Sequence, residues 1–111
     1  MIKIVWLLRR APDLSLEEFS KWWLEKHAPM IVNKQGRFLK RYIVNIRIAQ
    51  DNLPAATGAE CEWDGLAEEW FENEDEARAA LTLPTAAEGR EDVLRHVSGF
   101  QRLIVTENQF V

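Results

Sequence analysis

The sequence predicts an α+β fold with elements in the order strand, helix, strand, strand, helix, strand. Apolar or alternating segments typical of strands occur at residues 2–9, 38–48, 62–71 and 100–106. Helix-start patterns follow the first and the third of these segments. The chain has 111 residues, which is room for one domain, and we expect residues 1–111 to form it.

The first strand and the first helix are predicted from their apolar patterns and from the signals at their ends. Residues 2–9 are mostly apolar, which favours a strand buried on both faces. Ser15 with Glu18 three residues later is a capping-box pattern that predicts a helix start. At 100° per residue, one face of this helix carries Leu16, Phe19, Trp23 and His27. Pro29 lacks the amide that would bond the carbonyl of Glu25, so we expect the helix to kink or end near His27.

The second and third strands follow from alternation. Residues 38–48 place mostly apolar side chains on one face: Phe38, Tyr42, Val44, Ile46 and Ile48, with Lys40 as the exception. Residues 51–58 contain a proline and a glycine and are expected to form a loop. Residues 62–71 form the predicted third strand.

The second helical region has two start signals. Asn73 with Glu76 predicts one helix start, and Thr85 with Glu88 predicts a second. The latter helix is expected to include Val93, Leu94 and Val97. Gly99 is expected to end it before the last strand.

With right-handed crossovers, this order of strands and helices gives a ferredoxin-like βαββαβ sandwich with both helices on one face of the sheet. The other face is then uncovered. Because large exposed apolar patches usually mark interfaces, we expect a homodimer whose two sheets face each other and enclose a cavity.

Composition excludes several classes of function. The formal net charge is −4, without a basic stripe, so we expect no nucleic-acid partner. No apolar run approaches the roughly 18 residues that cross a bilayer, so we expect no membrane partner and a cytoplasmic location. Cys61 is the only cysteine and there are two histidines, which leaves no intramolecular disulfide and argues against a metal centre.

His27 is the leading catalytic candidate because it ends an apolar helix face beside a proline. A histidine held partly out of water there can act as a general acid or base, although it can also be a structural residue that caps a carbonyl.

Glu68 and Glu69 are consecutive in a strand, so they point to opposite faces. Glu69 shares its face with the apolar Trp63, Ala67 and Phe71, and Glu68 shares its face with Asp64, Leu66 and Trp70. A carboxyl in an apolar pocket has a raised pKa and can transfer protons, whereas an edge-strand charge would only discourage aggregation. Tyr42 could orient a carbonyl oxygen.

Five tryptophans exceed what a core of this size requires. Several could line a pocket for a flat, apolar ligand, or they could form a dimer interface. The residues expected to shape the pocket wall are Trp6, Trp23, Trp70 and Phe19.

The run from Leu7 to Phe19, followed by Trp22-Trp23 and His27-Ala28-Pro29, resembles the EthD-like proteins. The resemblance continues through Arg41-Tyr42, Asp64-Gly65, Trp70-Phe71 and Val105-Thr106-Glu107. It implies a dimeric α/β barrel that works without metal or organic cofactor. The wider group includes methylmuconolactone isomerases, in which the histidine matching His27 is an active-site residue. Those enzymes carry a cysteine where this chain has Glu69.

Three functions remain open from the sequence. The first is a cofactor-independent proton-transfer enzyme of isomerase, cyclase or lyase type, acting on a small flat lactone, phenolic or polyketide intermediate. His27 would be its base or acid, with Glu69 or Glu68 as partner. The second is a cofactor-free monooxygenase, with Trp70 and Asn45 supplying its tryptophan and asparagine, or a haem-degrading relative. The third is a non-catalytic dimeric small-molecule binding protein.

Overall fold

The computed structural model describes the whole chain except residues 57 and 59–60. Its elements are the strands β1 (Ile2–Arg10), β2 (Leu39–Ile46), β3 (Gly65–Phe71) and β4 (Val97–Val105), the helices α1 (Leu16–Trp22), α2 (Ala28–Gln35), α3 (Glu74–Leu81) and α4 (Ala86–Leu94), and the π-helical turn η1 (Trp23–His27). The strands form an antiparallel sheet in the order β2-β3-β1-β4. This topology confirms the predicted α+β, ferredoxin-like fold. The predicted loop at 51–58 includes residue 57, which lies outside the described residues.

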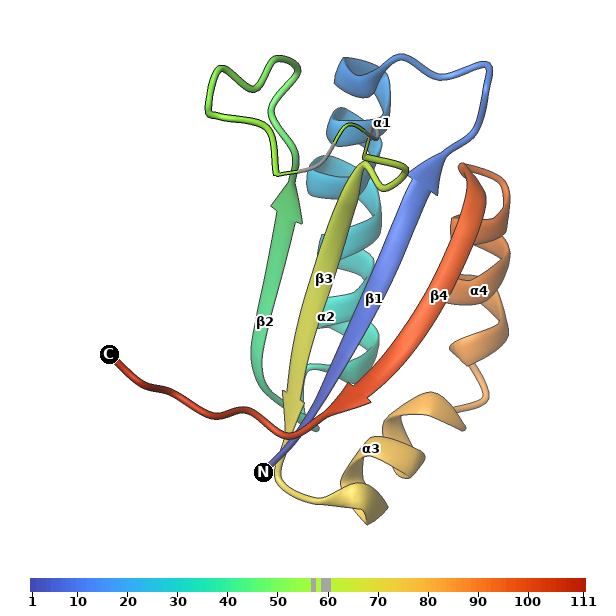
Figure 1. Ribbon diagram of the computed structural model, residues 1–111. Coiled ribbons are helices and arrows are strands. Elements are labelled where there is room, and N and C mark those ends of the chain that lie inside the picture. Colours follow the sequence, from blue (N-terminus) through green and yellow to red (C-terminus); the bar gives the residue numbers. More distant parts are fainter. Residues whose placement is uncertain (57, 59–60) are drawn as a thin grey trace.

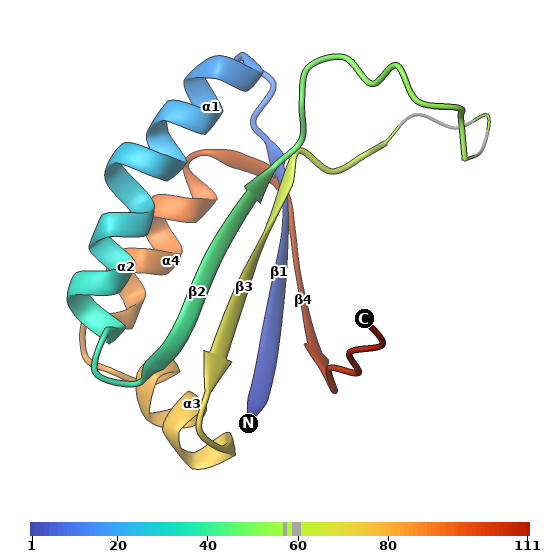
Figure 2. The same ribbon diagram turned by 90° about the vertical axis from the view of Figure 1, so that its left-hand side faces the viewer.

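The sheet is covered on one side. Figures 1 and 2 show α1, α2 and α4 against one face, with α3 at the end of the sheet. Alternate strand residues point into this helix layer, so Ile4 and Leu8 of β1 and Ala67 and Phe71 of β3 are buried. In the described part of the chain, no helix lies on the opposite face. We call this opposite side of the sheet the uncovered face.

The predicted helix starts at Ser15 and Asn73 are present. The Ser15 hydroxyl accepts a hydrogen bond from the Glu18 amide at 3.0 Å, and the Glu18 carboxylate accepts one from the Ser15 amide at 3.0 Å. This is the predicted capping box. The Asn73 side chain likewise accepts from the Glu76 amide at 2.9 Å. Both caps satisfy amides that have no partner within their own helix.

Of the two outcomes predicted near His27, a kink or an ending, the ending is wrong, because the helix continues past this residue. It passes through the π-helical turn η1 and continues as α2 to Gln35 (Figure 2). The Ala28 amide bonds the Trp23 carbonyl, five residues earlier. Pro29 follows this turn, and its ring nitrogen has no hydrogen to donate to the preceding turn. The wider turn therefore absorbs the missing hydrogen bond of Pro29.

The second helical region ends earlier than predicted. α4 stops at Leu94, and Val97 and Gly99 belong to β4, where they pair with Arg10 and Arg9 of β1. These residues are in a strand because their backbone groups form hydrogen bonds with β1. Thr85 precedes α4, but its side chain makes no capping hydrogen bond.

β2 and β3 are also shorter than predicted, and a buried aspartate lies just before the start of β3, between β1 and the end of β2. Asp64 accepts hydrogen bonds from the Arg10 amide at 2.8 Å and from Arg47 Nε at 3.0 Å. β3 begins at the next residue, Gly65. None of the described helices is long and apolar enough to cross a membrane.

Candidate active site

A cavity of about 310 Å³ lies within one chain, between the helices and the covered face of the sheet. A cavity between two facing sheets was expected from the sequence; this one lies under the chain's own helices. Apolar side chains make up much of its wall. Its polar lining residues are His27, Gln35, Tyr42, Glu69, Arg90 and Arg102. An apolar cavity with a few convergent polar groups is typical of a small-molecule site.

His27 ends the η1 turn and is buried, with 6% of its surface exposed. Its Nδ1 lies 2.9 Å from Oδ2 of Asp92 on α4. The same oxygen accepts a hydrogen bond from Trp22 Nε1 at 3.2 Å. Because a carboxylate only accepts, this contact fixes the tautomer with hydrogen on Nδ1 and leaves a lone pair on Nε2.

The charge state of His27 follows from its burial. Desolvation lowers the pKa of His27, and the hydrogen bond and charge of Asp92 oppose that shift only in part. His27 is therefore neutral at neutral pH, and its Nε2 can accept a proton. The capping role considered for His27 does not apply, since its Nδ1 partner is a side-chain carboxylate.

Glu69 lies on β3, on the same face as Ala67 and Phe71, and is 5% exposed. Its Oε1 accepts a hydrogen bond from the indole Nε1 of Trp6. Burial raises the pKa of Glu69 to about 7, against the smaller lowering effect of this hydrogen bond. A carboxyl with such a pKa is present in both protonation states at neutral pH, which suits a general acid or base.

Tyr42 of β2 is the register partner of Glu69 on β3, so their side chains share the covered face. Burial raises the pKa of the Tyr42 phenol, and the nearby Glu69 charge adds to this effect. Tyr42 therefore stays neutral and can donate its O–H to an oxygen in the cavity.

The predicted aromatic wall is present in part. Trp6 and Trp23 line the cavity, and Trp6 stacks on Phe100 with ring centroids 5.1 Å apart. Phe19 is fully buried, 5.6 Å from the Trp22 ring and 5.5 Å from the Trp23 ring. It supports the wall from behind and is not itself a lining residue.

Glu68 and Trp70 lie on the uncovered face, because strand residues alternate. Glu68 Oε1 is 2.8 Å from Lys3 Nζ. The Trp70 ring lies between Lys3 and Arg41, at 4.5 and 4.8 Å, and its Nε1 donates to Glu107 at 3.2 Å. The expectation that Trp70 shapes the wall of this cavity is therefore wrong, and of the two adjacent glutamates Glu69 is the one in the cavity.

Four polar residues of the site were not predicted from the sequence: Gln35, Arg90, Asp92 and Arg102. The spacing of Ala86, Gly89, Arg90 and Val93 marks one face of a helix and could have drawn attention to α4. Asp92 gave no local signal, since it meets His27 across 65 residues of sequence. Among the described residues, no three His, Cys, Asp or Glu side chains are grouped so that they could hold a metal ion.

The fold and the cavity define a ferredoxin-like α+β protein with a histidine and a buried carboxyl in one pocket. Residues 11–99 match the EthD domain, so the chain belongs to the EthD family. No curated protein matches the chain.

Solved structures of similar fold cover nearly the whole chain. An EthD family protein from Bacillus halodurans has a TM-score of 0.73 at 17% identity, covering 97% of this chain and 99% of its own. SnoaB, a cofactor-independent oxygenase from Streptomyces nogalater, has a TM-score of 0.68 at 12% identity, with coverages of 99% and 95%. A dimeric ferredoxin-like protein of unknown function from Thermobifida fusca has a TM-score of 0.64 at 14% identity, with coverages of 96% and 90%. At these identities the likeness concerns the fold.

Proposed function

We propose that this protein is a cofactor-independent proton-transfer enzyme of isomerase, cyclase or lyase type. Its substrate is a small flat organic molecule such as a lactone, phenolic or polyketide intermediate. One observation carries the proposal: a single apolar cavity holds a neutral histidine and a carboxyl group whose pKa is about 7. The pair can therefore exchange protons with a bound molecule at neutral pH.

The chemistry needs only the side chains of this chain. His27 Nε2 removes a proton from an acidic C–H of the substrate, and the electron pair left behind is delocalised onto a conjugated oxygen. Tyr42 donates its O–H to that oxygen and stabilises the developing charge. Protonated Glu69 then delivers a proton to another carbon or to a leaving oxygen. Proton return from the histidinium to Glu69, through the product or solvent, restores the starting state.

Asp92 acts through His27. Its carboxylate holds the Nδ1 hydrogen and stabilises the histidinium that forms when Nε2 takes a proton. Trp6 has the corresponding role beside Glu69, because its indole hydrogen bond favours the carboxylate formed after proton donation.

The test is proton NMR in deuterated water with a panel of muconolactones and phenolic ketones. Wild type, His27→Ala, Glu69→Gln and, as the matched control, Glu68→Gln are compared. We expect deuterium exchange at an acidic C–H with wild type and Glu68→Gln, and its loss in the other two variants. Exchange that is equal in wild type and His27→Ala would contradict the proposal. Binding without exchange would favour a carrier, and consumption of oxygen would favour an oxygenase.

The oxygenase alternative is supported by the fold likeness to SnoaB. The two residues expected to serve it do not meet in the cavity, however. Asn45 donates to the Leu66 carbonyl and to Glu68 at 3.3 Å, on the uncovered face with Trp70. Oxygen chemistry at this pocket would therefore have to use other residues.

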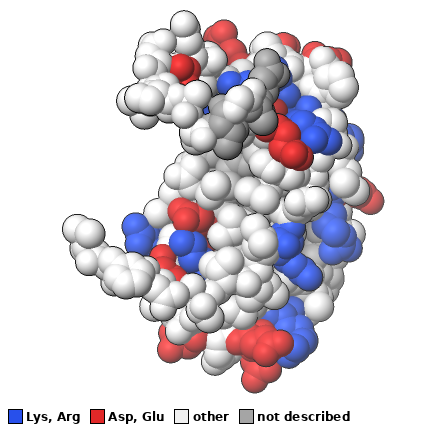
Figure 3. All heavy atoms as spheres, viewed as in Figure 1, with Lys and Arg blue, Asp and Glu red and all other residues white. Residues whose placement is uncertain are grey.

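We also propose that the uncovered face pairs with a second copy of the chain. Its apolar residues include Val5, Leu7, Ile43, Leu66 and Leu103. Figure 3 shows the middle of this face largely free of charged atoms, with charged groups on both sides of it. A patch of this kind favours burial in an interface, and the dimeric protein from Thermobifida fusca has a similar fold.

Leu103→Glu tests this pairing, since Leu103 is on an edge strand and 48% exposed. Sedimentation equilibrium should show a dimer for wild type and a monomer for this variant. Ile104→Glu is the control, because Ile104 is the next residue, 59% exposed, and points to the other face. A monomeric wild type would overturn the proposal.

A further inference from the structure

Two arginines of the cavity have no carboxylate partner. Arg90 comes from α4 and Arg102 from β4, and both line the cavity. Within the described residues, neither guanidinium lies within 4.0 Å of a carboxylate. Arg10 and Arg47, by contrast, both pair with Asp64. Arg90 and Arg102 are both exposed residues that line the cavity, so the two cations lie where it opens to solvent.

Arg102 belongs to the wall that carries the proposed acid. It is the register partner of Trp6 across β4 and β1, and its Cζ lies 5.7 Å from the Trp6 ring centroid. Trp6 in turn donates its indole hydrogen to Glu69. A negatively charged group held by Arg102 would thus lie on the Trp6 side of the cavity.

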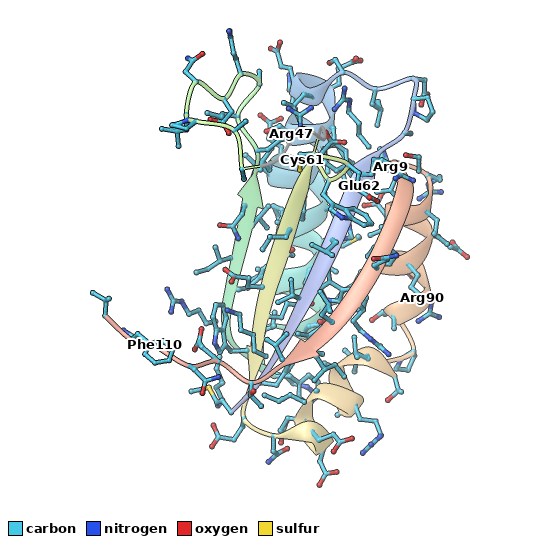
Figure 4. The ribbon with its side chains drawn as sticks, in the orientation of Figure 1. Arg9, Arg47, Cys61, Glu62, Arg90 and Phe110 are labelled. Atoms are coloured by element: carbon cyan, nitrogen blue, oxygen red, sulfur yellow. The ribbon has the colours of Figure 1, made fainter. Side chains whose placement is uncertain are left out.

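Arg90 belongs to the helix that carries the partner of His27. It is labelled on α4 in Figure 4 and lies two residues before Asp92. Gly89 beside it leaves room, since a Cβ added there would meet only Ile31 Cδ1 at an ordinary 3.5 Å. The two guanidinium groups therefore come from opposite layers of the molecule, one from the helices and one from the sheet.

We propose that the substrate of this cavity carries a carboxylate, which Arg90 and Arg102 bind while its ring or conjugated system occupies the apolar part. The inference rests on the proposed function and names the class of its substrate: cyclic or aromatic carboxylic acids. Guanidinium groups match carboxylates in shape and charge, and they also stack on aromatic faces as Arg102 does on Trp6.

A carboxylate there would also assist the chemistry. A negative charge near Glu69 favours its protonated form, which is the form that donates a proton. A neutral ligand of the same shape lacks this effect and leaves both guanidinium groups without an anion. The site therefore selects acids over their amides both in binding and in reaction.

The experiment compares phenylacetate with phenylacetamide, which has a similar shape and no charge. Binding is followed by the fluorescence of the cavity tryptophans Trp6 and Trp23 in wild type, Arg90→Gln, Arg102→Gln and the double variant. Arg37→Gln is the control, since Arg37 is exposed like Arg90 and Arg102 but does not line the cavity. Circular dichroism checks the fold of each variant.

We expect wild type and Arg37→Gln to bind the acid at least about 10-fold more tightly than the amide, the size of effect typical of charged hydrogen bonds. Each cavity variant should weaken acid binding and leave amide binding unchanged, and the double variant should show no preference. Equal affinity for both compounds in wild type, or an unchanged preference in the double variant, would overturn the inference. Arg-dependent acid binding without proton exchange on any substrate would instead remove the proposed function and leave the carboxylate site standing.

Discussion

The two faces of the sheet each contain a tryptophan whose indole N–H donates to a glutamate, with opposite results. On the covered face Trp6 donates to Glu69, and burial raises the pKa of that carboxyl to about 7. On the uncovered face Trp70 donates to Glu107, whose pKa is lowered, first by the hydrogen bond from Lys3 and then by that from Trp70. The same kind of hydrogen bond is thus made to a carboxyl that can be protonated, Glu69, and to a carboxylate that stays ionised, Glu107. The difference comes from burial, which dominates at Glu69, and from the direct contact with Lys3, which dominates at Glu107.

The largest expected effect is the difference in proton-exchange rate between variants of the two adjacent glutamates of β3. Glu69→Gln removes the cavity acid and should lower proton exchange by about 10²–10⁴-fold, the range typical of a general acid or base. Glu68→Gln should leave the rate within about twofold, because Glu68 faces away from the cavity. The NMR exchange assay measures both. A large loss in Glu68→Gln with normal exchange in Glu69→Gln would reverse the comparison.

The positions of these two glutamates were predictable from the sequence, but that of the neighbouring Trp70 was not. Alternation placed Glu68 and Glu69 on opposite faces and put Glu69 in the apolar row, and the structure agrees. The same alternation puts Trp70 with Glu68, yet the sequence analysis assigned Trp70 to the pocket on its size and type. A residue's type says less about its neighbours than its register does.

Elsewhere in the fold, the predictions that were confirmed depend on residues close in sequence. Several predictions that were wrong depend on residues distant in sequence. The caps at Ser15 and Asn73 depend on residues three apart, and both formed. The end of α4 depends on pairing between β4 and β1, whose residues are distant in sequence. Asp92 meets His27 for the same kind of reason, so the second half of the candidate base could not be found from spacing.

The next effect concerns stability against pH. The pKa of Glu69 is about 7 when folded against 4.5 as its ordinary value. As pH rises from 4.5 to 7, the unfolded chain releases this proton first, so the free energy of unfolding falls by about 3 kcal/mol and then levels off. Glu69→Gln should remove this fall, and Glu68→Gln should retain it.

Urea unfolding at pH 5, 6, 7 and 8 measures this difference between variants. His27 works in the opposite direction, because its lowered pKa means that stability is lost as pH falls below its ordinary value of 6.5. Subtracting the Glu69→Gln curve from that of wild type cancels the His27 contribution. Parallel curves for the two proteins would show that Glu69 is ionised at neutral pH in the folded state.

A smaller effect should follow from removing each indole donor. Trp6→Phe keeps an aromatic ring and deletes the hydrogen bond to Glu69, so the pKa of Glu69 should rise above about 7. Trp70→Phe should raise the pKa of Glu107 only part of the way to its usual value, because Lys3 is the larger cause of its shift. Carboxyl-carbon NMR titrations measure both groups. A fall in the pKa of Glu69 would show that Trp6 does not stabilise its anion.

The smallest effect is expected for the ion pair of the uncovered face, and it depends on whether that face is covered by a partner. Lys3 contacts Glu68 at 2.8 Å and Glu107 at 3.1 Å. In a monomer such surface pairs contribute less than about 1 kcal/mol, so Lys3→Met in the Leu103→Glu background should change the free energy of unfolding by no more than that.

In a dimer the same pair is removed from water, and a carboxylate left there without its cation costs several kcal/mol. Lys3→Met in the otherwise wild-type chain should therefore destabilise more than in the Leu103→Glu chain, as urea unfolding at equal concentration would show. Equal effects in both backgrounds would mean that the ion pair stays in water and that the uncovered face is not the dimer interface.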